Sequence, residues 1–229
     1  MAHMANIFDG VRAVLFDMDG TLVETNIDFP LMRREVAALG ERCGVPASDL
    51  QGLDILAGVD LIVSRLTERG RPEEAVHARQ EAYEKLEQIE LSHAEDARAI
   101  SGACDVLQAL RDAGIKVAIV TRNCRAAVLL SLELAGISSD VLLTRDDVPK
   151  AKPDPDHLLR ALAMLGAPPD EAITIGDHWM DADAGKAAGT RTIGFLRTDR
   201  QDDFFDAHKP GLVVRDLAEL LGLINRLKE

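Results

Sequence analysis

The 229-residue chain is rich in aliphatic and poor in aromatic side chains: 47% of its residues are hydrophobic, but only 3% are Phe, Trp or Tyr. This composition is typical of a parallel sheet covered by helices on both faces and disfavours a β-sandwich. The length allows one good core and a smaller accessory domain. Because the formal net charge is −13, which repels phosphate backbones and anionic lipids, we expect neither nucleic acid nor a membrane as a partner.

The cysteine count and the start of the chain bear on where the protein is found. Cys43, Cys104 and Cys124 form neither a paired framework nor a zinc-binding spacing, which favours reduced thiols. No apolar run approaches the roughly 20 residues of a membrane helix, and nothing resembles a signal peptide. Residues 1–3 are expected to be a remnant of an expression vector ahead of a native Met4. We therefore expect a cytoplasmic protein, as a monomer or homodimer.

Short apolar runs alternate with helical patterns along most of the chain. The predicted strands are residues 11–16, 116–121, 141–143, 172–177, 191–195 and 212–214. The predicted helices that follow or separate them are residues 103–113, 125–135, 156–165, 180–188 and 217–227. Strand–helix alternation of this kind predicts βαβ units and an α/β fold with a Rossmann-like, doubly wound parallel sheet.

One long segment interrupts this alternation. From about Asn26 to Ile100 we find only helical periodicity and no run typical of a strand. The expected helices are residues 29–39, 50–66 and 72–91, with Gly52 and Gly58 as candidate breaks in the second. We predict a helical domain at residues 25–100, inserted into a catalytic core formed by residues 5–24 and 101–229.

Polar residues gather where the predicted strands end. In an open parallel sheet, ligands bind beyond the carboxyl ends of the strands. The candidates there are Asp17 and Asp19 after the first strand, Thr121 at the end of the second, and Asp177 at the end of the fourth, with Asp181 beyond. Lys152, in a Lys-Pro-Asp-Pro segment, can reach the same volume.

Such a group of residues has a definite chemistry. Crowded carboxylates repel one another unless a cation lies among them, and oxygen ligands of this kind suit Mg²⁺. Asp17 can attack phosphorus as a nucleophile, and Asp19 can give a proton to the leaving group and later take one from water. Thr121 and Lys152 can hold the transferring oxygens. Backbone N–H groups after Asp17, in particular those of Met18 and Gly20, can add donors.

Four motifs together resemble the haloacid dehalogenase superfamily of phosphohydrolases. They are Asp17-Met18-Asp19-Gly20-Thr21, Thr121 at the end of a strand, Lys152 before its prolines, and Gly176-Asp177 with Asp181. The resemblance implies Asp17 as nucleophile, Asp19 as acid and base, and Mg²⁺ held by Asp17, the Asp19 backbone carbonyl and Asp177, with Asp181 in support. The helical insertion looks like the cap of the phosphoglycolate phosphatase-like branch. An acid at position 19 points to phosphate esters, because a halide leaving group needs no proton.

Two departures from the family pattern leave alternatives open. Arg122 follows Thr121, where it either adds a guanidinium to the phosphate cradle or points to solvent. His178 follows Asp177, where it hydrogen-bonds near the metal, serves as an extra acid or base, or is merely tolerated.

We therefore expect a magnesium-dependent phosphatase that hydrolyses a small phosphorylated metabolite, of the phosphoglycolate or sugar-phosphate type, through an aspartyl-phosphate intermediate. The alternatives are a phosphomutase of the same family and a catalytically silent protein that binds a phosphorylated metabolite.

Overall fold

The computed structural model describes residues 6–228, in two compact units. One unit comprises the described residues up to Thr25 and from Asp96 onward, and we call it the core unit. The other, Asn26–Glu95, we call the helical unit. The expected vector remnant and Met4 lie outside the described residues.

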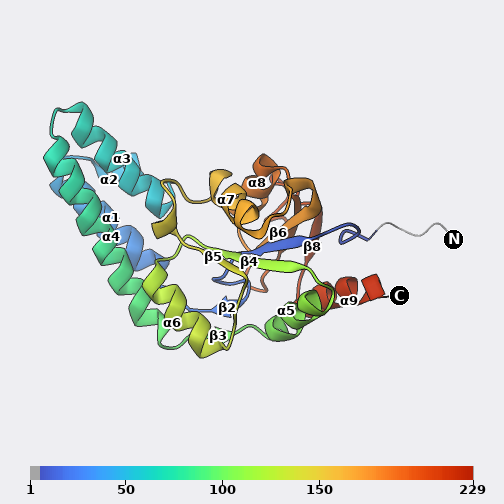
Figure 1. Ribbon diagram of the computed structural model, residues 1–229. Coiled ribbons are helices and arrows are strands. Elements are labelled where there is room, and N and C mark those ends of the chain that lie inside the picture. The colour runs from blue at the N-terminus through green and yellow to red at the C-terminus, as the bar shows by residue number, and fades with distance from the viewer. Residues whose placement is uncertain (1–5, 229) are drawn as a thin grey trace. The chain divides into compact units, whose positions relative to one another are not determined.

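A six-stranded sheet, parallel throughout, organises the core unit (Figure 1), in the order β5-β4-β1-β6-β7-β8. Its strands are β1 Ala13–Phe16, β4 Lys116–Val120, β5 Val141–Leu143, β6 Ala172–Gly176, β7 Arg191–Phe195 and β8 Leu212–Val214. The predicted α/β fold with a doubly wound parallel sheet is confirmed. The strand order reverses between β1 and β6, which is where such sheets bind ligands.

Helices cover both faces of this sheet, which explains why the sequence of β1 is apolar throughout. Ala13 and Leu15 belong to the apolar cluster on one face, and Val14 and Phe16 to that on the other. The first face is covered by α7 (Asp156–Leu165) and α8 (Trp179–Ala188), and the second by α5 (Ala103–Asp112), α6 (Arg125–Ala135) and α9 (Leu217–Asn225). A strand buried on both faces has no polar position, so the aliphatic runs follow from this layering.

The helical unit has its own apolar interior, which includes the fully buried Ile62, Leu66 and Leu86. Its helices are α1 Phe29–Arg42, α2 Ala47–Leu50, α3 Ile55–Glu68 and α4 Pro72–Ala94. The expected helix at 50–66 breaks near Gly52, as predicted, but the candidate break at Gly58 is wrong. Gly58 lies inside α3, where a Cβ would come within 3.3 Å of Val36, so this glycine allows close packing of α3 against α1.

Two short strands join the core to the insertion. β2 (Val23–Glu24) and β3 (Arg98–Ala99) pair antiparallel, where the chain leaves the core unit and where it returns. The expectation of no strand before Ile100 is therefore wrong at β3, because two residues are too few to show a period. The 3₁₀ turns are Arg145–Asp147, Pro169–Glu171 and Arg226–Lys228.

Over the described part of the chain, no helix combines the length and the apolar character needed to cross a membrane.

Candidate active site

A tight loop follows β1. The Met18 carbonyl accepts hydrogen bonds from three successive backbone N–H groups, those of residues 21–23. Gly20 has φ of +78°, and a Cβ there would lie 2.3 Å from Asp177 Oδ2. A glycine is therefore needed both for the left-handed backbone and for the close approach. The Gly20 N–H, a predicted phosphate donor, donates to the Val23 carbonyl at 2.8 Å in this conformation.

Three carboxylates, two at strand ends and one in the first turn of α8, meet beside this loop. Carboxylate oxygens of Asp17, Asp177 and Asp181 all lie within 4.8 Å of one another. Lys152, whose side chain is only 2% exposed, joins two of them: its Nζ donates to Asp17 Oδ1 at 2.7 Å and to Asp181 Oδ1 at 2.5 Å. The structure thus brings together four residues that the sequence spreads over 165 positions of chain.

The carboxylates of this cluster repel one another and are poorly solvated. Burial, together with the neighbouring Asp181 and Asp19 carboxylates, raises the pKa of Asp17 to about 7, although Lys152 opposes the shift. Burial, Asp17 and Asp181 hold the pKa of Asp177 well above its ordinary value. A cation would relieve this repulsion, and ligands that are all carboxylate oxygens are those that Mg²⁺ prefers. The residues present therefore fit a magnesium ion.

The carboxylate of Asp19 faces a different set of groups. It accepts hydrogen bonds from Thr25 Oγ1 at 2.7 Å, from Thr121 Oγ1 at 3.2 Å and from Asn123 Nδ2 at 3.2 and 3.3 Å. Burial raises the pKa of Asp19, and these three donors oppose the rise. Thr121 therefore contacts Asp19 and is itself buried. Sequence reasoning did not assign Thr25 or Asn123 to the site; for Asn123, an amide close after Thr121 was an available signal.

The two residues with open roles lie near the start of α8. The half-buried Arg122 guanidinium contacts Met180 Sδ. His178 caps α8: its Nδ1 accepts the Met180 N–H at 3.4 Å, and its own N–H donates to Asp181 Oδ2 at 3.2 Å. Burial lowers the pKa of His178 to about 4, so the ring is neutral and can accept. The hydrogen bond from His178 orients the Asp181 carboxylate, so His178 supports the site.

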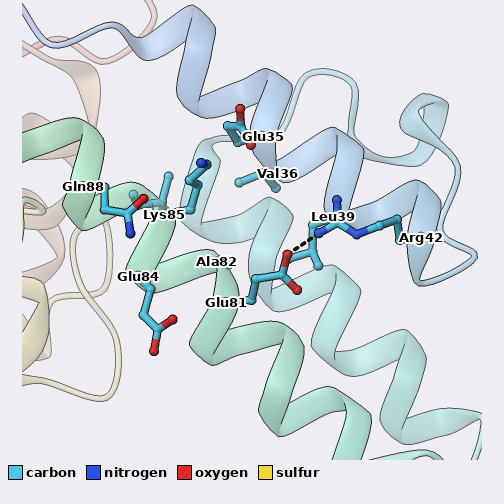
Figure 2. A pocket seen from close by; sticks show the side chains of 10 residues that line it. Glu35, Val36, Leu39, Arg42, Glu81, Ala82, Glu84, Lys85 and Gln88 are labelled. Atoms are coloured by element: carbon cyan, nitrogen blue, oxygen red, sulfur yellow. Dashed lines mark hydrogen bonds and ion pairs between the residues drawn. The ribbon is translucent and has the colours of Figure 1, made fainter.

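The helical unit contains a groove of about 400 Å³ between α1 and α4 (Figure 2). Charged side chains of both signs line it, and Arg42 pairs there with Glu81. Within residues 6–228, the metal-binding geometry belongs to the Asp17, Asp177 and Asp181 cluster and not to this groove. The chemistry is therefore expected at the strand ends.

Comparison with known proteins identifies the family of the chain. Residues 11–189 match the haloacid dehalogenase-like hydrolase family. Pyrophosphatase PpaX of Bacillus velezensis is 32% identical over 220 residues, which cover 92% of this chain and 95% of that protein. Pyrophosphatase PpaX of Bacillus pumilus is 36% identical over 122 residues, 52% of this chain and about half (56%) of that protein. A predicted phosphoglycolate phosphatase from Haemophilus somnus superposes with a TM-score of 0.60 at 20% identity, covering 96% of this chain and 99% of that one.

The family match places this parallel sheet, with Lys152 bridging Asp17 and Asp181, among the hydrolases. The chain belongs to the haloacid dehalogenase-like hydrolase family, and its fold is that of the phosphoglycolate phosphatase-like structure.

Proposed function

We propose that the protein is a magnesium-dependent phosphatase that uses Asp17 as its nucleophile. The observation that carries the proposal is the placement of the Asp17 carboxylate within hydrogen-bond reach of Lys152 and beside Asp177 and Asp181. The Asp19 carboxylate lies two residues away in a separate network of donors. Lys152 favours the charged form of Asp17, which burial opposes, and Asp19 lies where its proton can be exchanged.

The proposed reaction has two steps. Asp17 forms a bond to phosphorus while the bond from phosphorus to the leaving oxygen breaks, and Asp19 gives that oxygen a proton. Asp19 then takes a proton from a water that attacks the aspartyl phosphate, which releases phosphate and restores Asp17. The hydroxyls of Thr25 and Thr121 can turn to accept from Asp19 when it is protonated, whereas the Asn123 amide favours the charged form.

Mg²⁺ would be held by Asp17, Asp177 and the backbone carbonyl of Asp19, and when bound it neutralises charge on the phosphoryl oxygens. Lys152 binds Asp17 and Asp181 and supplies a fixed positive charge to the same oxygens. This local charge offsets the acidic character of the whole chain toward an anionic substrate.

The substrate class rests on two different lines of support. The sequence favours a small phosphorylated metabolite of the phosphoglycolate or sugar-phosphate type. The full-length relative from Bacillus velezensis is named a pyrophosphatase, which favours inorganic pyrophosphate as a second candidate. We propose that the helical unit acts as the cap that selects among them.

The proposal is tested by phosphate release from pyrophosphate, phosphoglycolate and several sugar phosphates, with Mg²⁺ and with EDTA. We expect release that requires Mg²⁺ and falls by at least about 10³-fold in Asp17→Asn, because that change removes the nucleophile. The exposed Asp206→Asn is the matched control and should retain full activity.

Other outcomes are equally informative. Isomerisation of a sugar phosphate without net phosphate release would support the mutase. Binding without turnover would support the silent binder. Release that persists in Asp17→Asn would contradict the assigned nucleophile.

A further inference from the structure

Arg197, just after β7, lies among three carboxylates that no motif connects with it. Its Nη2 and Nη1 donate to Glu24 Oε1 and Oε2 at 3.0 and 3.4 Å. Its Nε donates to Asp199 Oδ1 at 3.2 Å and lies 3.9 Å from Asp177 Oδ2. The arginine side chain is 24% exposed. It therefore ties the segment after β1 to the end of β6 by its two-pronged geometry and its charge.

The contact with Glu24 reaches Asp19 through one intermediate residue. Glu24 is followed by Thr25, whose Oγ1 donates to Asp19 Oδ1 at 2.7 Å. Holding Glu24 therefore fixes the hydroxyl that orients the Asp19 carboxylate. The guanidinium also covers the loop itself, since a Cβ on Gly20 would lie 2.8 Å from Arg197 Nη1. Arg197 therefore binds Glu24 and lies close to Gly20, near the two ends of this short segment.

The contact with Asp177 acts by charge. A guanidinium 3.9 Å from a carboxylate of the acidic cluster partly neutralises it. That carboxylate is one of the groups expected to hold the cation. A fixed positive charge at this distance therefore weakens cation binding while it stabilises the metal-free cluster.

We infer that Arg197 is a positioning residue with two separable effects: it orients Asp19 through Glu24 and Thr25, and it lowers the affinity of the Asp177 cluster for a divalent cation. The inference rests on the proposed phosphatase function. It does not make Arg197 a catalytic residue, because none of its contacts reaches Asp17 or the reacting atoms.

The test uses the full chain and two independent readouts: calorimetric titration of the metal-free protein with Mg²⁺, and kcat on a substrate that the wild type hydrolyses. Arg197→Met should bind Mg²⁺ about three- to tenfold more tightly, because one nearby charge is gone, while kcat falls about tenfold or more. Arg197→Lys keeps the charge and loses the fork, so it should bind Mg²⁺ like the wild type and still lose kcat. Glu24→Gln should lower kcat without tightening Mg²⁺ binding.

Arg215→Met is the control, since Arg215 makes an exposed ion pair with Asp202, and it should change neither readout. A rise in affinity with a fall in kcat is a result that general damage to the fold does not produce. Unchanged kcat and affinity in Arg197→Met, or a loss of both, would overturn the inference. If the wild type binds Mg²⁺ but hydrolyses no phosphorylated substrate, the proposed function fails, and the titrations alone decide the charge effect.

Discussion

A buried histidine holds the backbone of Lys152, whose side chain binds Asp17, the proposed nucleophile. The Lys152 N–H donates to His157 Nδ1 at 3.3 Å, and His157 is fully buried at the start of α7. Burial and the Lys152 charge lower the pKa of His157 to about 3, so the ring is neutral and its Nδ1 can accept. Sequence reasoning gave His157 no role, because its direction depends on how α7 packs.

We predict that His157→Leu lowers kcat about tenfold, because the Lys152 N–H loses its acceptor and the ammonium moves relative to Asp17. His157→Asn keeps an acceptor at a similar place and should recover activity to within about threefold of the wild type. Steady-state kinetics on both variants, with thermal unfolding alongside, makes the comparison. Equal losses in the two variants would show that side-chain volume matters and the hydrogen bond does not.

At the scale of elements, the junction of β6 and α8 depends on a glycine. A Cβ on Gly176 would lie 2.2 Å from the Asp181 carboxylate, which Lys152 binds and which accepts from the His178 N–H. The last residue of β6 must therefore lack a side chain for the first turn of α8 to pack against it.

We predict that Gly176→Ala lowers the free energy of unfolding by about 1–3 kcal/mol, because a buried clash forces neighbours to shift. Gly222→Ala, within α9 and with no atom closer than 4.0 Å to the added Cβ, is the control and should be neutral or slightly stabilising. Denaturant unfolding of both variants measures the difference. Equal stability of the two would mean that the strand end relaxes without cost.

The sequence predicted those elements that are long enough to carry a pattern. The strands and helices of the core were found because burial on both faces makes each strand an apolar run. β2 and β3 were missed because two residues carry no period, and the role of Gly58 was missed because it depends on the neighbouring α1. In the site, the acids at strand ends could be located from topology. Asn123 carried a signal that was not used, its place close after Thr121. Thr25 and Arg197 could not be located, because their roles depend on how the segment after β1 folds back on Asp19 and on a contact between residues 173 positions apart.

At the scale of the whole molecule, the metal-free protein carries an excess of buried negative charge. The pKa of Asp17 is raised to about 7 in the folded state from 3.8, so the folded protein binds a proton here that the unfolded chain has lost. The stability that this proton binding to Asp17 contributes is therefore fully present below about pH 4 and is lost as the pH rises through about 7.

We predict that in EDTA at pH 8, Asp17→Asn is more stable to unfolding than the wild type, by roughly 1–4 kcal/mol. The difference should shrink as the pH falls toward 4, because protonation removes the same charge. Added Mg²⁺ should stabilise the wild type more than the variant. Denaturant unfolding from pH 4 to 8 tests this; a pH-independent difference would contradict the raised pKa of Asp17.

The pairing of β2 with β3 has a consequence for how this protein can change over evolution. Because Val23 lies opposite Ala99 and Glu24 opposite Arg98, the insertion leaves and re-enters the core through two adjacent points. The entropic cost of closing such a loop rises only slowly with the length of the loop. A longer, shorter or unrelated insertion could therefore replace the helical unit at little thermodynamic cost to the sheet. With the proposed role of this unit in substrate selection, substrate preference can then diverge among descendants while the acids at the strand ends stay as they are.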